Sequence, residues 1–251
     1  MPQRFEGQAA VVTGGADGLG RAIAHRLAQE GAAVTLMDHD ADKLAQTQAA
    51  FAQDDIEAHT ATADVSDDHA VAEALRGAAE RHGRLDIAVH CAGIVGPNGK
   101  PITEVDIEDF DRVMAVNLRG SFSVVKHALP PMLAQDYGRI LLFASIAGKD
   151  GNAGMCAYSA TKAGVIGLVK AVGKEHAETG VTINAVAPAV IRTALVDAMD
   201  PAQVTYMTDK IPAKRCGTLE ETAALAAWIV SPEASFNTGF TFDLSGGRAV
   251  Y

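Results

Sequence analysis

The sequence predicts an α/β fold in which a doubly wound parallel sheet carries helices on both faces. Short runs of β-branched and apolar residues alternate with helical stretches along nearly the whole chain. These runs are continuously apolar, as is typical of strands that are buried on both faces of a sheet. Crossovers between parallel strands are right-handed, so the alternation builds one open sheet with helices on either side.

The first 83 residues are predicted to contain three strands and three helices. The apolar run 9–15 is a buried strand that enters a glycine turn. Residues 19–31 follow it with apolar positions at helical spacing, and Gly31 is the stop signal. The next elements are the strand 32–38, the Ala- and Gln-rich helix 40–53, a strand within 56–65, and the helix 67–83, which ends at glycine.

The second part of the chain continues the pattern. A long helix around 109–135 is expected to break late at Pro130–Pro131, because proline lacks the N–H that a helix needs. The remaining elements are the strands 85–93, 138–148, 181–188 and 241–247 and the helix 156–179. Only the stretch 192–217 has no clear pattern, and a loop of this length in a compact domain is usually functional. We therefore expect it to be a substrate loop.

Length and composition bound the class of protein. The 251 residues are 48% apolar, and no linker or repeat interrupts them, so we expect one domain over 1–251. The net charge of −10 disfavours a nucleic-acid or anionic-membrane partner. No apolar run is long enough to cross a bilayer, and the start lacks the form of a signal peptide. A reducing cytoplasm is the simplest setting, and we expect no disulfide and no metal, because neither C-x-x-C nor H-E-x-x-H occurs.

The turn TGGADGLG, residues 13–20, lies between the first predicted strand and the first helix. Gly14, Gly18 and Gly20 let the backbone turn sharply and approach a pyrophosphate without a Cβ clash. The helix behind them directs its free N–H groups and positive end at the phosphates. Strand, glycine turn and helix in this order indicate a dinucleotide site.

Asp38 ends the second predicted strand, where a carboxylate accepts hydrogen bonds from the adenosine ribose of NAD and repels the 2′-phosphate of NADP. Asp17 and His39 occupy places where an NADP enzyme favours Arg or Lys. The sequence therefore predicts NAD as cofactor. A strand-end aspartate that caps the next turn is the alternative.

The stretch YSATK places Tyr158 and Lys162 on one face of a predicted helix. The spacing by itself is also that of an ordinary solvated helix face. As an acid/base unit it has a clear chemistry, because a free tyrosine is a poor base at neutral pH and a nearby ammonium lowers its pKa. Ser145, at the end of the fifth predicted strand, is placed to donate a hydrogen bond to a substrate oxygen.

From Val12 to about Gly247 the chain resembles the short-chain dehydrogenase/reductase family. The markers appear in family order: the glycine turn at 13–20, Asp64–Val65, C-A-G at 91–93, Asn117, Ser145, Tyr158-x-x-x-Lys162, and N-A-V-A-P at 184–188 followed by Thr193. The resemblance implies a Rossmann-like fold with a seven-stranded parallel sheet. It also implies hydride transfer between NAD and a secondary alcohol or ketone.

The same resemblance assigns roles to the marker residues. Lys162 would also hold the nicotinamide ribose hydroxyls, and Asn117 would hold a water in a proton relay, the alternative being a local helix bond. The implied cofactor-binding residues are Gly14, Asp17, Gly18, Leu19, Gly20, Asp38, Asp64, Val65, Cys91, Ala92, Gly93, Tyr158, Lys162, Pro188, Ile191 and Thr193. Two positions depart from the family pattern: Cys91 replaces an asparagine, and Ala189 replaces a glycine.

The substrate is predicted less sharply. Lys149 and Arg192 are cations near the predicted pocket, and we hypothesise that one of them meets a substrate carboxylate, although surface charges beside a mobile loop look the same. The ending SGGRAVY resembles those of enzymes acting on sugars and sugar acids, so our first hypothesis is a 2-keto-3-deoxy sugar acid or a similar polyhydroxy acid in carbohydrate metabolism. The alternatives are a 3-oxoacyl-thioester reductase, another small hydroxy-compound dehydrogenase and a non-catalytic NAD-sensing binder.

The resemblance also implies an oligomer, because family members are often homotetramers or dimers. Trp228 and Tyr251 are candidates for such an interface, with core burial the alternative for Trp228.

Overall fold

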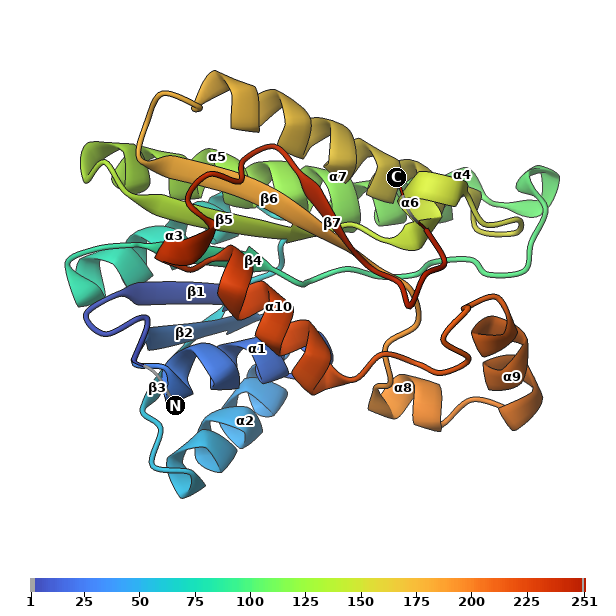
Figure 1. The fold of residues 1–251 in the computed structure, drawn as a ribbon, viewed down its shortest axis with the longest axis horizontal. Helices are drawn as coiled ribbons and strands as arrows, with labels where there is room; N and C mark the ends of the chain where they lie inside the picture. Colours follow the sequence, from blue (N-terminus) through green and yellow to red (C-terminus); the bar gives the residue numbers. More distant parts are fainter. Residues whose placement is uncertain (1–2, 250) are drawn as a thin grey trace.

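The computed structural model describes residues 3–249 and 251, and its strands lie side by side in one parallel sheet (Figure 1). The strand order is β3-β2-β1-β4-β5-β6-β7. The strands are β1 (Ala9–Thr13), β2 (Ala33–Asp38), β3 (Ala58–Thr62), β4 (Ile87–His90), β5 (Gly138–Phe143), β6 (Val181–Pro188) and β7 (Thr241–Leu244). The predicted seven-stranded parallel sheet is confirmed.

The order of the strands reverses next to β1. The chain adds β2 and β3 on one side of β1, then returns to place β4 on its other side. Ligands of open α/β sheets bind at such a reversal, beyond the carboxyl ends of the strands. The fold therefore puts the expected site beyond the ends of β1 and β4.

Helices cover both faces of this sheet, as predicted (Figure 1). One layer consists of α1 (Gly18–Gln29), α2 (Ala41–Gln53) and α10 (Leu219–Ile229), and the other of α3 (Asp68–His82), α5 (Gly120–Ala134) and α7 (Cys156–Glu175). Successive residues of a strand point to opposite faces. Val12 accordingly packs in the first layer's core, whereas Val11 packs in the second. Continuous apolar strands are needed to fill both cores.

The helix predicted around 109–135 differs from the structure in two ways. It consists of α4 (Ile107–Val113), a π-helical turn (Met114–Arg119) and α5. The predicted break at Pro130–Pro131 is wrong, because α5 continues through both prolines to Ala134. Pro130 is exposed and Pro131 half-buried in the last turns, where water can reach the carbonyl groups that the prolines leave unpaired.

The stretch 192–217 is not a structureless loop. It contains α8 (Ala194–Asp197) and α9 (Pro201–Asp209), which extend away from the sheet in Figure 1. Asp200 caps α9, and Pro201 occupies the first turn. The helix buries none of its residues, so the sequence has no apolar face there to reveal it.

The remaining short elements are α6 (Ile146–Asp150) and the 3₁₀ turns Ile102–Glu104 and Pro232–Ala234. Trp228 is half-buried, and its ring meets Phe242 edge-on with the centroids 5.7 Å apart. Core packing is therefore the better description of this tryptophan. Within the described part of the chain, no helix is long and apolar enough to cross a membrane.

Candidate active site

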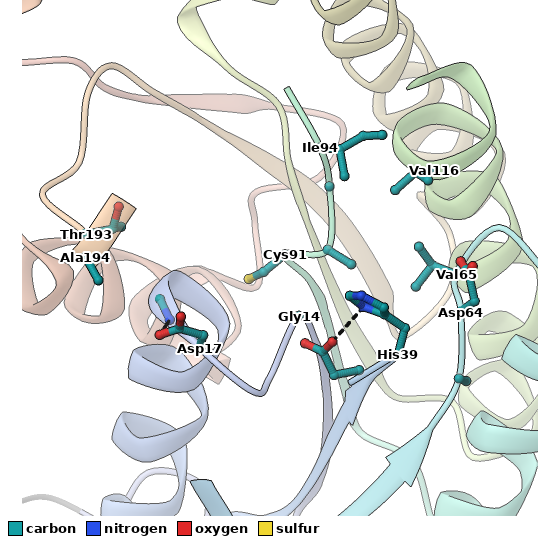
Figure 2. Close-up of a pocket in the computed structure, with 15 residues that line it drawn as sticks. Gly14, Asp17, His39, Asp64, Val65, Cys91, Ile94, Val116, Thr193 and Ala194 are labelled. Atoms are coloured by element: carbon teal, nitrogen blue, oxygen red, sulfur yellow. Dashed lines mark hydrogen bonds and ion pairs between the residues drawn. The ribbon is translucent and has the colours of Figure 1, made fainter. Parts of the chain in front are cut away.

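A cavity of about 450 Å³ opens beyond the carboxyl ends of β1, β2, β3 and β4. Figure 2 shows Asp17 and Thr193 on one side of it, and Asp64 and Val65 on the other. The predicted cofactor residues that line it are Gly14, Asp17, Gly18, Asp38, Asp64, Val65, Cys91, Ala92, Gly93 and Thr193. The strand reversal therefore brings together residues that are far apart in the sequence.

The glycine turn has the close backbone contacts that the sequence predicts. Gly14 has φ +65°, and a Cβ atom there would lie 2.9 Å from the nitrogen of Ala92. A Cβ at Gly20 would lie 2.1 Å from the Gly14 oxygen, which no side chain can accept. At Gly18 the nearest heavy atom would be the Thr193 methyl, at 4.0 Å, so this glycine leaves open space beside the cavity.

Asp17 and Leu19 flank Gly18 and have different surroundings. Asp17 is the N-cap of α1, and its carboxylate accepts a hydrogen bond of 2.7 Å from the Gly18 nitrogen. The side chain of Leu19 packs against the apolar core and does not line the cavity. Leu19 can therefore contribute only through its backbone N–H in the first turn of the helix.

Asp38 stands at the end of β2 with its carboxylate at the cavity wall. Oδ2 accepts a hydrogen bond of 3.3 Å from the Ala16 nitrogen, and Oδ1 accepts one of 3.2 Å from the Asp40 nitrogen. The His39 ring lies 2.9 Å from the same Oδ1. Asp38 therefore caps the following turn, as the alternative expected, and also lines the cavity.

Asp64 and Val65 follow β3 on the opposite wall. The Asp64 carboxylate accepts a 2.8 Å hydrogen bond from the Ser66 nitrogen, and this bond is the main reason that the pKa of Asp64 lies below its usual value. Val65 is buried, and a Cβ at Gly120 would lie 3.1 Å from it. This wall is consequently rigid and negatively charged.

The segment after β4 forms the floor of the cavity. The Ala92 nitrogen donates to Thr13 Oγ1 over 3.2 Å, which ties the floor to β1. A Cβ at Gly93 would lie 3.2 Å from Asn117 Oδ1 and 3.6 Å from Lys162 Nζ. Burial raises the pKa of the Cys91 thiol well above its usual value, so this cysteine is not a nucleophile.

Ser145, Tyr158 and Lys162 meet at the carboxyl end of β5. Ser145 caps α6, and its Oγ accepts a 3.1 Å hydrogen bond from the Ala147 nitrogen. Tyr158 and Lys162 lie on one face of α7, with Nζ of the lysine 5.6 Å from the centre of the phenol ring. Lys162 Nζ lies next to Gly93 of the cavity lining, whereas none of the three side chains is itself among the residues that line the cavity.

The electrostatics of this group differ from the expectation. Burial raises the pKa of Tyr158, and a hydrogen bond with Ser145 opposes that rise only in part. Burial also lowers the pKa of Lys162 to about 8. The lysine does not lower the phenol pKa here, because its Nζ donates instead to the Phe143 carbonyl oxygen at 2.6 Å.

Asn117 lies in the π-helical turn and is 1% exposed. Its Nδ2 donates to the Ile94 oxygen, its Oδ1 accepts from the Ile94 nitrogen, both over 2.8 Å, and Nδ2 also reaches Thr161 Oγ1 at 3.2 Å. These partners are distant in the sequence, so the alternative of a local helix bond is wrong. The amide holds the cavity floor against α7.

Three predicted residues lie at or just after the end of β6. Pro188 ends that strand, Ile191 forms a bridge with Gly217, and Thr193 is the N-cap residue of α8. Of the three, Thr193 alone lines the cavity. The Ile191 bridge fixes where the 192–217 segment leaves the sheet.

Both predicted substrate cations are paired. Lys149 lies 2.8 Å from Asp243 Oδ1, its side chain is 7% exposed, and its Nζ also contacts the Tyr251 carbonyl oxygen. Arg192 forms a 2.7 Å hydrogen bond with Asp197, but its side chain is 69% exposed. Lys149 therefore holds the last residue of the chain, whereas Arg192 can turn.

Sequence reasoning missed His90, which ends β4 and is 2% exposed. Its Nδ1 lies 2.7 Å from Thr13 Oγ1, its Nε2 has no hydrogen-bond partner, and burial lowers its pKa to about 3. A histidine at the last position of a buried strand was a signal that the sequence offered. Among residues 3–249 and 251, no cluster of side chains is suited to a metal ion, and the three cysteines are free.

Comparison with known proteins agrees with this geometry. The family model described as short chain dehydrogenase matches residues 8–203. The chain is 46% identical to a 2-dehydro-3-deoxy-L-rhamnonate dehydrogenase (NAD(+)) of Sphingomonas sp. (strain SKA58), over 99% of this chain and 98% of that protein. It is 35% identical to a 3-oxoacyl-[acyl-carrier-protein] reductase of Vibrio cholerae, over 97% and 98% of the two chains. A crystal structure of NAD⁺-bound xylitol dehydrogenase superposes with a TM-score of 0.91 at 28% identity, covering 97% of this chain and 99% of the other.

Proposed function

The chain belongs to the short chain dehydrogenase family, and from that premise we propose that it is an NAD-dependent oxidoreductase acting on a sugar acid. The reaction moves a hydride between NAD and a carbon that alternates between C–OH and C=O. One observation carries the proposal: Ser145, Tyr158 and Lys162 gather beyond the end of β5, with Lys162 next to Gly93 in the lining of a glycine-rich cavity.

The cavity has the features that a dinucleotide requires. Gly14 and Gly18 leave backbone room for a pyrophosphate at the first turn of α1, and Asp38 presents a carboxylate to an adenosine ribose. With Asp64 on the opposite wall, the negative charge of this end disfavours the 2′-phosphate of NADP. The bound nicotinamide ring supplies the hydride acceptor or donor.

Tyr158 is our candidate for the proton step. In oxidation the phenolate accepts the proton of the substrate hydroxyl, and in reduction the neutral phenol returns it. Ser145 donates a hydrogen bond to the same substrate oxygen. Lys162 holds ribose hydroxyls and places its positive charge beside the phenol when it turns from the Phe143 carbonyl.

Asn117 connects the segment after β4 to the helix that carries Tyr158 and Lys162. Its amide fixes Ile94 and contacts Thr161, which lies between the tyrosine and the lysine on α7. We assign it the role of positioning the cavity floor against the helix that carries Tyr158.

The sugar-acid substrate rests on the relative from Sphingomonas, whose name states an NAD⁺-dependent reaction of such an acid. Arg192 is the better of the two candidate partners for its carboxylate. It is largely exposed next to α8, whereas Lys149 is occupied by Asp243 and by the end of the chain. A guanidinium also matches a carboxylate in shape.

A substrate screen with NAD and NADP in parallel tests this proposal through the absorbance of the reduced nicotinamide. Reduction of NAD by one or more sugar acids, with little turnover of NADP, is the expected result. Turnover of uncharged apolar alcohols alone would contradict the carboxylate, and oxidation of NADPH with a 3-oxoacyl thioester would favour the reductase alternative.

Assembly into a homotetramer or dimer is a further part of the proposal. Phe122 of α5 is 52% exposed beside a groove formed with Met114, Leu118 and Leu168 of the neighbouring helices. A second copy of the chain is the occupant we propose for this face. Light scattering after size-exclusion chromatography tests it, and Phe122→Glu is expected to give a smaller species.

A further inference from the structure

The carboxylate of Asp38 is already engaged by its own neighbours. Oδ1 lies 2.9 Å from the His39 Nδ1 and accepts a 3.2 Å hydrogen bond from the Asp40 nitrogen. Oδ2 accepts one hydrogen bond, of 3.3 Å, from the Ala16 nitrogen. Each carboxylate oxygen offers two acceptor positions. Oδ1 therefore accepts one hydrogen bond and has the His39 ring in contact with it, and Oδ2 has one acceptor position left.

A ribose presents two adjacent hydroxyl groups, and binding both to one carboxylate requires a free position on each oxygen. The bonds from Ala16 and Asp40 come from backbone N–H groups that the turn fixes. The His39 contact comes from a side chain that is 79% exposed, while the side chain of Asp38 is 13% exposed. Of the three partners, the His39 ring alone can leave by rotating into solvent.

We infer that His39 and the adenosine ribose of NAD compete for Oδ1 of Asp38, so that His39 sets the cofactor affinity and turns away when the cofactor binds. This inference rests on the proposed function, because it presumes that NAD occupies the cavity. It gives His39 a role distinct from that of Asp38. The aspartate binds the ribose hydroxyls, and the histidine lowers the affinity of that carboxylate for them.

The charges around the ring give the competition a pH dependence. Figure 2 shows His39 on the side of the cavity where Asp64 and Val65 lie. Its ring forms a 2.9 Å ion pair with the Asp38 carboxylate. The other charged groups near this edge are Asp17, Asp40, Asp64 and Arg119. Carboxylates and guanidinium groups ordinarily keep their charge between pH 6 and 8.5, whereas histidine ordinarily changes its own. A protonated His39 holds Asp38 more tightly, so the Kd for NAD rises as the pH falls.

Isothermal titration of the full chain with NAD and with ADP-ribose, at pH 6.0 and pH 8.5, measures the competition directly. His39→Leu removes the donor and keeps an apolar side chain over the adenosine end. It is expected to lower the Kd for both ligands about two- to fivefold at pH 6.0, the range for an exposed ion pair, and by less at pH 8.5. His39→Asn retains an uncharged donor, and its Kd is expected to vary less with pH than that of the wild type.

His25→Leu is the matched control, because His25 forms a 2.9 Å pair with Asp54 between α1 and α2. It is expected to leave both Kd values and their pH dependence unchanged. An equal or higher Kd for His39→Leu at both pH values would overturn the inference, as would an equal effect of His25→Leu. Failure of the wild type to bind either ligand would overturn the proposed cofactor itself, and the inference with it.

Discussion

The chain contains two Tyr-x-x-x-Lys pairs with the same spacing, and they differ in burial and in the group to which the lysine donates. Tyr206 and Lys210 lie at the end of α9, where Lys210 Nζ donates to the phenol oxygen over 2.7 Å and lies 4.0 Å from the ring centre. That hydrogen bond lowers the pKa of Tyr206, whose side chain is 63% exposed. By the direct contact between ammonium and phenol, this is the pair that looks activated.

In the other pair Lys162 is buried and Tyr158 is half-buried, and the lysine bonds to the Phe143 carbonyl instead of the phenol. Burial raises the pKa of the tyrosine and lowers that of the lysine to about 8. The comparison teaches that spacing makes two side chains neighbours, while their surroundings decide the chemistry. A half-buried phenol beside a buried lysine can be charged when a positively charged ligand arrives, whereas an exposed phenol is already screened by water.

Substituting each of the two lysines tests whether the surroundings of the pair decide its chemistry. Lys162→Met is expected to lower kcat about a hundredfold or more, since it removes the ammonium from a proton-transfer site. Lys210→Met is expected to change kcat less than about twofold, because its partner is solvated. Steady-state NADH formation measures both, with the thermal unfolding midpoint as a control for folding. Equal losses would mean that the buried environment is not what matters.

The pH dependence of kcat/KM tests the raised pKa of Tyr158. A raised phenol pKa leaves little phenolate at neutral pH, and its fraction grows about tenfold per pH unit, so kcat/KM for oxidation is expected to rise about a hundredfold between pH 7 and 9. The reduction direction needs the neutral phenol, which stays the dominant form below the raised pKa, so its rate is expected to change little over the same interval. Initial rates in both directions test this. An oxidation rate that falls with pH would be incompatible with Tyr158 as the base.

His90 extends the test of burial to stability. Its folded pKa of about 3 is below the ordinary value of about 6.5, so the neutral ring is the form that folding favours. The free energy of unfolding therefore falls as the pH drops below about 6.5, and this group alone contributes a loss of about 3 kcal/mol by pH 4. Denaturant unfolding at pH 7 and pH 4 measures the loss. His90→Asn is expected to reduce the difference between the two pH values, and an unchanged difference would contradict the assignment.

The smallest expected effect concerns the exposed pair. In Lys210→Met the Tyr206 phenol loses its hydrogen bond and the nearby charge, so its pKa rises toward the ordinary tyrosine value. Ultraviolet titration of the tyrosines, compared with the wild type, records the shift. A spectrum unaltered by the substitution would show that the contact does not persist in solution.

Most of the sheet could be predicted from the sequence, because continuous apolar runs such as Val11–Val12 are needed wherever both faces are covered. The segments that were missed lack that signal. α9 buries nothing, and a π-helical turn leaves no periodic trace around Asn117. Short helices held by caps instead of apolar faces are not visible to hydrophobic periodicity.

Some features of the site could also be predicted from the sequence, and others could not. The glycine turn could be predicted because the close approach of Gly14 and Gly20 excludes any side chain. The partner of each charged atom could not be predicted, because it depends on which group folding brings within reach. Lys149 meets Asp243 from a distant strand, and Lys162 meets the carbonyl of Phe143.

The measurement that tests the account most directly is the kcat of Tyr158→Phe beside that of Tyr206→Phe, with NAD and a sugar acid that the wild type turns over. Removing the Tyr158 phenol oxygen is expected to lower kcat at least a thousandfold while NAD binding and thermal stability persist, and removing that of Tyr206 is expected to leave kcat within about a factor of two. Retention of wild-type turnover by Tyr158→Phe would contradict the assignment of Tyr158 as the residue that moves the proton.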